Sequence, residues 1–343
     1  MRKHPIRLGI IGLGRAGLAM HCQEIHDKES KYTIVAACDT IAERRAQMAQ
    51  KYGCRTYARI ADLLADPEVE VADIATRSCD HYLHAVMALK AGKTVFLEKP
   101  MCQTYAEACK LRDIVRACGG RLYVRHNRRF EPGFQHVREI IASGILGKVF
   151  EIKLRRVSYQ CRSDWQAIRR FGGGQLLNWG PHLIDHGLRL LESPLKHVWS
   201  DLKKVTAVGD AEDHLKLILT GANGRIIDIE ISGGAALGEP EYLVWGTRGS
   251  LACTGMTITL KYINPKRPFI IPRRADPGTP GAGFSHPVTM HWVEKSIPVK
   301  PKLAVNMTTI WDVLYRTIRQ GAKFPIAMDE AVGVMQVVSL ARK

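Results

Sequence analysis

The sequence lacks several features that would define a class of protein. None of its apolar runs approaches the roughly 18 residues that cross a membrane. Its nine cysteines are scattered and include no C-x-x-C pair, so they predict reduced, packed thiols in place of a disulfide framework or a zinc site. No repeat, low-complexity segment, helix-turn-helix, RNA-binding or zinc-finger pattern is present. We therefore expect a globular protein with no metal, no nucleic-acid partner and no membrane partner.

Acidic residues are also scarce. The chain has 33 Asp and Glu against 50 Lys and Arg, which gives a net charge of +17. Such a charge fits either an anionic partner or a basic surface without one. Lys and Arg are spread along the whole chain, so we favour the dispersed surface. The first residues lead directly into an apolar run, and we expect no signal peptide and a cytoplasmic location.

The most informative motif of the sequence lies near the N-terminus. The apolar run Ile6–Ile11 leads into Gly12-x-Gly14-x-x-Gly17, and a helical pattern follows at once. This order predicts a buried strand, a tight turn and the start of a helix. Gly12 permits the turn, Gly14 lets the backbone approach a pyrophosphate, and Gly17 lets the helix lie close to the strand. A glycine-rich turn in an unrelated α/β protein is the alternative.

An acidic residue stands where a dinucleotide would need it. A second strand at residues 33–38 ends at Asp39, which is 39 − 17 = 22 positions after Gly17. The dinucleotide fingerprint has a carboxylate about 20 positions on, where it accepts hydrogen bonds from the adenosine ribose. Asp39 would repel a 2′-phosphate and so favours NAD, while Arg44 and Arg45 leave NADP open.

The hydrophobic pattern changes once along the 343 residues, which predicts two domains. Up to about residue 125, strands alternate with helices, so we expect a doubly wound parallel sheet. The strands are expected at 6–11, 33–38, 54–57, 71–75, 94–97 and 121–124, and the helices at 15–29, 41–52, 59–66, 80–91 and 105–118. Residues 1–125 then form a dinucleotide-binding domain, and residues 126–343 form a domain for substrate binding and oligomerisation.

The second part of the chain predicts an α+β domain with a large, mainly antiparallel sheet. Strand-like runs stand at 149–159, 197–208, 213–220, 225–232, 241–246 and 250–261, with a strong turn signal at 221–224. Helices are expected at 131–143, 181–192, 305–320 and 329–342, and a long loop rich in Pro and Gly at 264–287.

Three further stretches carry a family resemblance. They are residues 75–100, which end in Glu98-Lys99-Pro100, the segment His126-Asn-Arg-Arg-Phe130, and residues 172–186, which contain Pro181-His182-Leu-Ile-Asp185-His186. Together with the glycine motif they resemble the glucose–fructose oxidoreductase/inositol dehydrogenase (Gfo/Idh/MocA) family over residues 6 to 186. The resemblance implies a Rossmann domain, NAD or NADP, a sugar, inositol or related polyol as substrate, and a homodimer or homotetramer.

Lys99, His182 and Asp185 are the predicted catalytic residues. Lys99 follows the fifth strand at the carboxyl edge of the sheet, where its ammonium can polarise a carbonyl or bind a hydroxyl that is losing its proton. The imidazole of His182 suits a general base, and the resemblance implies that role. Asp185 lies one helical turn later and would orient substrate hydroxyls or the imidazole. His186 suggests a metal pair with His182, but no third ligand has recognisable spacing.

The remaining site residues follow from the rule that ligands bind at the carboxyl ends of parallel strands. The predicted cofactor-binding residues are Gly12, Leu13, Gly14, Arg15, Ala16, Gly17, Asp39, Thr40, Arg44, Thr76, Arg77, His81, Glu98, Lys99 and Asn127. The predicted substrate-binding residues are Lys99, Arg128, Trp165, Arg169, Asn178, His182 and Asp185.

Two departures from the family pattern bear on the substrate. Asn178 stands where many members have an acidic residue, and it can bond a hydroxyl but cannot relay a proton. Arg77 stands where the family has proline, so it either contacts the cofactor or points to solvent. Residues 158–170 should overhang the nicotinamide, with Trp165 as a face for a sugar ring and Arg162, Arg169 and Arg170 as donors for an anion. A neutral polyol and an acidic sugar both stay open.

The sequence thus predicts an oxidoreductase that passes a hydride between a nicotinamide cofactor and a hydroxyl-bearing carbon, with Lys99 and His182 assisting proton transfer. The resemblance leaves two alternatives. One is a redox-neutral enzyme that retains NAD and works through a transient keto-sugar. The other is a regulator that binds a dinucleotide without catalysis, against which the presence of both Lys99 and His182 argues.

Overall fold

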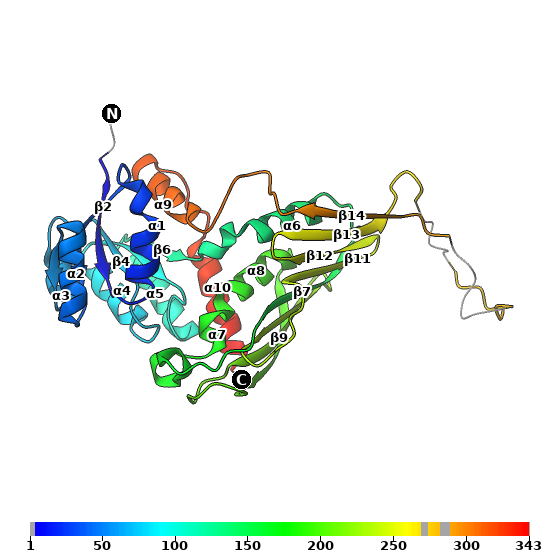
Figure 1. Ribbon diagram of the computed structural model, residues 1–343, viewed down its shortest axis with the longest axis horizontal. Coiled ribbons are helices and arrows are strands. Elements are labelled where there is room, and N and C mark those ends of the chain that lie inside the picture. Colours follow the sequence, from blue (N-terminus) through cyan, green and yellow to red (C-terminus); the bar gives the residue numbers. More distant parts are fainter. Residues whose placement is uncertain (1–3, 269–273, 282–288, 343) are drawn as a thin grey trace.

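Two sheets with helices between them make up the protein (Figure 1). The computed structural model describes residues 4–268, 274–281 and 289–342. The first sheet has the strand order β3-β2-β1-β4-β5-β6, and all its strand pairs are parallel. Its strands are β1 (Ile6–Ile11), β2 (Tyr32–Cys38), β3 (Arg55–Tyr57), β4 (Val71–Ile74), β5 (Thr94–Glu98) and β6 (Leu122–Arg125). This is the predicted doubly wound sheet, whose carboxyl ends meet at one edge.

Helices connect these strands as the sequence predicts. They are α2 (Ala42–Tyr52), α3 (Ile60–Ala65), α4 (His81–Lys90) and α5 (Tyr105–Ala117). The first connection differs from the expected single helix over 15–29. It is a π-helix (Gly17–His21), then α1 (Cys22–Glu24), then a 3₁₀ turn (His26–Lys28). The backbone N–H of His21 donates to the carbonyl of Ala16 over 2.9 Å, five residues back, which is the π-type bond that sets this geometry.

The second sheet has eight strands in the order β14-β13-β12-β11-β7-β10-β9-β8. Within this sheet, β10 and β7 pair in parallel, and the other pairs of its described strands are antiparallel. Its strands are β7 (Val149–Val157), β8 (Leu195–Lys203), β9 (His214–Gly221), β10 (Ile226–Ser232), β11 (Tyr242–Gly246), β12 (Gly249–Thr254), β13 (Thr257–Ile263) and β14 (Trp292–Pro298).

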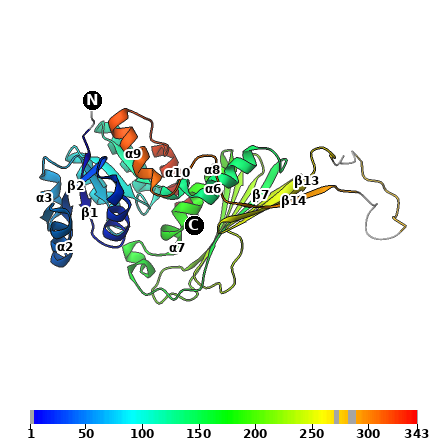
Figure 2. The same ribbon diagram turned by 45° about the horizontal axis from the view of Figure 1, so that its top comes forward.

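Three helices pack along one face of this sheet, as the two views show (Figure 1, Figure 2). They are α6 (Pro132–Ala142), α8 (Gly180–Leu191) and α10 (Met328–Leu340), with the short α7 (Gln175–Asn178) before α8. Strand residues that face these helices are buried, and β9 alternates strictly, with Leu215, Leu217 and Leu219 fully buried. No helix of the described residues covers the opposite face.

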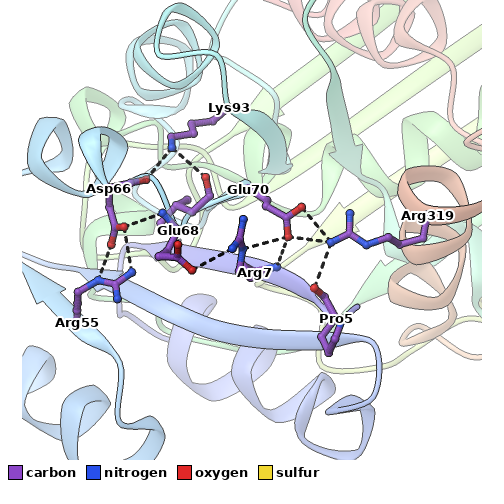
Figure 3. A network of polar contacts seen from close by, with 9 residues as sticks. Pro5, Arg7, Arg55, Asp66, Glu68, Glu70, Lys93 and Arg319 are labelled. Atoms are coloured by element: carbon purple, nitrogen blue, oxygen red, sulfur yellow. Dashed lines mark hydrogen bonds and ion pairs between the residues drawn. The ribbon is translucent and has the colours of Figure 1, made fainter. Parts of the chain in front are cut away.

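Helix α9 (Thr309–Gln320) returns to the first sheet. Its Trp311 is fully buried, and the hydroxyl of Tyr32 on β2 donates to the Trp311 carbonyl over 2.5 Å. At the edge of the sheet where β1 and β4 begin, Arg319 of α9 donates to both carboxylate oxygens of Glu70, over 3.0 and 2.8 Å, and to the carbonyl of Pro5 (Figure 3). These contacts cross the predicted domain division at residue 126, since α9 belongs to the later part of the chain.

Two details of the second sheet differ from the sequence prediction. The run at 250–261 is two strands, β12 and β13, joined by a tight turn in which Gly255 has a φ of +55°. Strand β14 was not predicted and pairs with β13 along its whole length. Part of the predicted loop at 264–287 lies outside the described residues. No described helix is both long and apolar enough to cross a membrane.

Candidate active site

The glycine turn forms a cradle at the carboxyl edge of the first sheet. Gly12 has a φ of +92°, and a Cβ there would lie 2.8 Å from the carbonyl oxygen of Ala75. A Cβ at Gly17 would overlap the carbonyl oxygen of Gly12, so the helix can start this close to the strand only with glycine. A Cβ at Gly14 would meet nothing within 4 Å, because Gly14 faces open space. The three glycines therefore have the geometry that a bound pyrophosphate requires.

Gly12 and Gly14 line a cavity of about 620 Å³, which we call the glycine-loop cavity. Asp39, Thr40 and Arg44 line it at its far end. The Asp39 carboxylate accepts from the backbone N–H of Leu13 over 2.8 Å and lies 3.5 Å from the Arg44 guanidinium. The side chain that would bind a ribose is thus held by the glycine loop itself.

A second cavity of about 700 Å³ lies between the first sheet and α8, and we call it the central cavity. The two cavities share seven lining residues, so they form one continuous cleft. The shared residues are Arg15, Ala16, Thr76, Arg162, Asp164, Trp165 and Gln166. The last four belong to the segment 158–170, which overhangs the cleft as the sequence predicts.

Lys99 lies at the floor of the central cavity, directly after β5. Its ammonium donates to the backbone carbonyl of Asn178 over 3.0 Å, which leaves N–H groups for a ligand. Burial lowers the pKa of Lys99 to about 8, helped by Arg125, Arg15 and Arg128 and opposed by the adjacent Glu98. An ammonium with this pKa can give up or hold a proton near neutral pH.

His182 faces the same cavity from the first turn of α8. Its ring lies edge-on to Trp179, with centroids 5.7 Å apart, and its Nδ1 is buried without a hydrogen-bond partner. Burial lowers the pKa of His182 well below 6.5, and the nearby cations Lys99 and Arg128 lower it further. The imidazole is therefore neutral at pH 7 and free to accept a proton.

Asp185 lies away from the cleft, in contrast to the predicted contact with substrate. Its carboxylate is 1% exposed and accepts from two nitrogens of Arg129, over 2.7 and 2.6 Å. Arg129 also pairs with Glu330 of α10 over 2.5 Å.

His186 is also removed from the cleft, because its ring stacks on Phe134 with centroids 3.8 Å apart. No group of described residues could hold a metal ion.

The other predicted site residues divide into those that line one of the two cavities and those that line neither. The glycine-loop cavity is lined by Gly12, Gly14, Arg15, Ala16, Asp39, Thr40, Arg44, Thr76 and Arg77, and the central cavity by His81, Glu98, Lys99, Asn127, Arg128, Trp165, Asn178 and His182. Leu13, Gly17, Arg169 and Asp185 line neither cavity. Arg169 is exposed, and its backbone N–H donates to Asp210. The Arg77 guanidinium lies 4.5 Å from the ring centre of Phe171, which directly follows the overhanging segment 158–170. This contact therefore connects the end of that segment to the first domain.

Sequence reasoning missed a buried ionic chain beneath the central cavity. His21 of the π-helix is fully buried between Asp73, at 2.8 Å, and Glu98, at 3.2 Å. Arg125 then joins Glu98 to Glu24, with a 2.5 Å bond to each. The indole N–H of Trp311 also donates to Glu24, over 2.7 Å. An aspartate inside the apolar strand β4 was the available signal, because a buried charge needs a partner.

This ionic chain sets the charge of the cleft floor. Burial by itself lowers the pKa of His21, but the charge and hydrogen bonds of Asp73 together with the hydrogen bond to Glu98 outweigh it, and the pKa rises to about 9. The Glu98 pKa is lowered, because Arg125, His21 and Lys99 together outweigh the effect of its burial. His21 and Arg125 are therefore protonated and Glu98 is ionised at neutral pH, and Glu98 is fixed beside Lys99.

Comparison with known sequences agrees with this geometry. Residues 6–126 match the sequence model described as "Oxidoreductase family, NAD-binding Rossmann fold", and residues 134–252 match the GFO/IDH/MocA C-terminal domain. The chain belongs to the Gfo/Idh/MocA oxidoreductase family. The expected family, the NAD(P)-binding Rossmann domain and the large mainly antiparallel sheet are thereby confirmed.

Members of the Gfo/Idh/MocA family with several named activities are similar to this chain. An uncharacterized oxidoreductase of Schizosaccharomyces pombe is 28% identical over 90% of this chain and 86% of its own. The scyllo-inositol 2-dehydrogenase (NADP(+)) IolW of Bacillus subtilis is 23% identical over 98% of this chain and 92% of its own. The D-glucoside 3-dehydrogenase of Escherichia coli is 28% identical over 57% and 56%.

Solved structures share the fold of this chain. An NAD-binding protein from Listeria innocua has a TM-score of 0.82 and 23% identity, covering 98% of this chain and 95% of its own. Biliverdin reductase from Synechocystis, solved with biliverdin and NADP+, has a TM-score of 0.78 and 20% identity over 98% of both chains.

Proposed function

We propose that this protein is an NAD(P)-dependent dehydrogenase that oxidises a CH–OH group of a sugar, inositol or related polyol, or reduces the corresponding ketone. The observation that carries the proposal is the meeting of Lys99 and His182 in the central cavity. One is an ammonium with free donors, and the other is a neutral imidazole with an unpartnered nitrogen. The names of the inositol and glucoside dehydrogenases among its relatives support the substrate class.

The glycine-loop cavity is where the dinucleotide would be held. The glycine cradle and Arg15 fit the pyrophosphate, and Asp39 fits the adenosine ribose. Thr76, His81, Glu98 and Asn127 would border the nicotinamide, because they line the central cavity beside Lys99. When bound, the nicotinamide supplies the hydride acceptor. The Asp39 carboxylate favours NAD, since a 2′-phosphate would be repelled there.

The protein's own groups then account for the movement of the hydroxyl proton. Neutral His182 accepts it as general base, and the Lys99 ammonium stabilises the negative charge that develops on the substrate oxygen. Asn178 and Arg128 line the same cavity and would bond neighbouring oxygens of the substrate. Asp185 has a structural role instead, because its carboxylate pairs with Arg129 and so holds α8 in place.

An activity panel tests the proposal. NAD and NADP are each combined with neutral sugars, inositols, glycosides, uronates and sugar phosphates, and the reduced cofactor is measured by absorbance. Turnover of one class should be lost in Lys99→Ala and in His182→Ala. Lys110→Ala is the matched control, because Lys110 is exposed on α5 away from the cleft.

Three other outcomes would contradict the proposal. Turnover that survives both substitutions would remove Lys99 and His182 from the reaction. Cofactor that stays bound through purification, with substrate converted but no net reduced cofactor, would show redox-neutral chemistry. Dinucleotide binding without conversion of any compound would favour the regulator.

A further inference from the structure

The charges that line the central cavity are not balanced at the end where a substrate would lie. The carboxylates that line this cavity and are not shared with the glycine-loop cavity are Glu24 and Glu98. Both are already bonded by Arg125, at 2.5 Å each. Asp164, at the shared part, is held by Arg162 over 2.8 and 3.0 Å. Each of these carboxylates therefore already has an arginine partner.

Two cations remain at the substrate end. The Lys99 ammonium has a backbone carbonyl as its hydrogen-bond partner rather than a carboxylate. Arg128 lies with its guanidinium 4.2 Å from the ring centre of Trp179, and the nearest carboxylate oxygen, of Glu131, is 3.2 Å away. That same oxygen also accepts from Arg156, over 2.5 Å, so Arg128 shares its counter-charge.

Arg128 is held in a geometry that suits an acidic group. Its guanidinium lies over the Trp179 ring and is paired with Glu131, which limits its movement, and its side chain is about one-fifth exposed and lines the cavity with His182. A planar, oriented guanidinium binds a carboxylate or phosphate by two parallel hydrogen bonds. At the neighbouring position of the cavity wall, Asn178 offers a neutral amide, which does not repel an anion.

The titration of the site agrees with this charge distribution. After burial, the cations Lys99 and Arg128 are the largest causes of the lowered pKa of His182, and Arg128 also contributes to the lowered pKa of Lys99. The cavity therefore has an excess of positive charge at its reactive end.

We propose that the substrate is a polyhydroxy compound that carries an acidic group, either a carboxylate or a phosphate, and that Arg128 binds this group beside Lys99 and His182. The inference rests on the proposed dehydrogenase function and narrows its substrate class. Arg128 becomes a specificity-determining residue. A neutral sugar would add no negative charge beside Lys99, or beside Arg128, which shares the Glu131 carboxylate with Arg156.

The test compares each acid with its neutral parent on the same protein. Glucose is set against glucuronate and glucose 6-phosphate, and galactose against galacturonate, with kcat/KM as the first measurement. A thermal-shift titration of the NAD-loaded protein with the same compounds measures binding without turnover. We expect kcat/KM for one of the acids to exceed that of its parent by at least about 10-fold. The carboxylate and phosphate arms decide which anion is bound.

Arg128→Gln isolates the charge. It should lower kcat/KM for the acid on the order of 100-fold, the usual effect of removing one side of a close charge pair, and lower kcat/KM for the neutral parent by a smaller factor. Arg128→Lys keeps the charge without the planar fork and should lie between the two. Arg138→Gln on α6 is the matched control, because Arg138 is exposed and lies over Phe134, outside both cavities.

The outcomes separate this inference from the proposed function. If neutral sugars are oxidised as well as the acids, or Arg128→Gln affects both alike, the acidic substrate is excluded and the dehydrogenase stands. If nothing is oxidised but an acid stabilises the NAD-loaded protein and Arg128→Gln removes that effect, the anion site stands and the dehydrogenase fails. Absence of both turnover and stabilisation for every acid would overturn the inference. Circular dichroism of each variant excludes misfolding.

Discussion

Lys99 and His182 differ in charge although they face the same cavity, and that difference sets the expected dependence on pH. His182 is neutral down to well below pH 6.5, so the base is available throughout the neutral range. The pKa of Lys99 is lowered to about 8, so its ammonium is lost as the pH rises through 8. We predict that kcat/KM for oxidation falls above about pH 8 and stays level from there down to pH 6.5.

Lys99→Arg tests the origin of that alkaline limb. A guanidinium keeps its charge throughout the accessible pH range. The variant should lose the fall near pH 8, even where its overall rate is lower. A limb that stays at pH 8 in Lys99→Arg would assign it to another group. The measurement is a kcat/KM profile from pH 5.5 to 10 in buffers of constant ionic strength.

A further prediction about a single residue concerns Asp39, whose carboxylate should decide between NAD and NADP. Replacement by serine removes the charge that opposes a 2′-phosphate, with Arg44 only 3.5 Å from the position of that carboxylate. We predict that Asp39→Ser raises the ratio of NADP to NAD affinity by at least about 10-fold, the effect of roughly 1.4 kcal/mol. Fluorescence titration of the reduced cofactors measures both constants. An unchanged ratio would contradict the assignment.

Asp185 shows where residue-level prediction stopped. Its spacing from His182 correctly gives one face of one helix, but spacing cannot say which distant group faces that side chain. Arg129, 56 positions earlier, occupies its carboxylate in the folded chain. Lys99 was easier to predict, because the end of a parallel strand fixes a place in the fold without knowledge of any partner.

A measurement on Asp185 follows. Removing one partner of a buried ion pair costs about 3–5 kcal/mol, so Asp185→Asn should lower the free energy of unfolding by an amount of that order. Its kcat/KM, corrected for the folded fraction, should fall far less than that of His182→Ala. Urea unfolding and the activity assay together check this. A loss of activity equal to that of His182→Ala, with stability unchanged, would return Asp185 to the catalytic set.

At the scale of elements, the alternation of strands and helices was predictable, because apolar runs after short connections define a parallel sheet. The π-helix was not, since it places His21 between Asp73 and Glu98, two residues that come to it from β4 and β5, and no local pattern shows those partners. The sheet against which α9 packs could not be predicted from the sequence either. An amphipathic pattern predicts a helix with one buried face but does not say which sheet receives it.

Trp311 attaches α9 to the first sheet, so substituting it tests how much this contact stabilises the fold. It is fully buried, touches the rings of His21, Tyr32 and Phe96, and donates to Glu24. Trp311→Ala should lower the free energy of unfolding by about 3–5 kcal/mol. It should also weaken cofactor binding, because the ionic chain loses one donor. Leu237→Ala, at a side chain that is 89% exposed, is the control and should change stability by less than about 0.5 kcal/mol.

At the scale of the whole molecule, the uncovered face of the second sheet stands out. Trp199 on β8 is 49% exposed, and Trp245 is only half-buried although β11 is an interior strand. The rings of Trp245 and Phe150 lie 6.5 Å apart. A sheet face with large aromatic side chains and no covering helix among the described residues favours association with a second copy.

We therefore expect a homodimer or homotetramer that forms through this face. Light scattering after gel filtration should give at least twice the monomer mass, and the double change Trp199→Glu with Trp245→Glu should shift the protein toward monomer. Leu237→Glu, at an exposed position outside the strands, should leave the mass unchanged. A wild-type protein that is monomeric at all concentrations would exclude this interface.

The return of α9 to the first sheet has a mechanical consequence. The chain passes from the first sheet to the second after β6, returns after β14 and leaves the first sheet again between α9 and α10. Helix α10 packs on α5 of the first half and on α8 of the second, so it joins the two halves through a shared apolar core. The two halves should therefore move little against each other, and the positions of Lys99 and His182 should be set before a ligand binds.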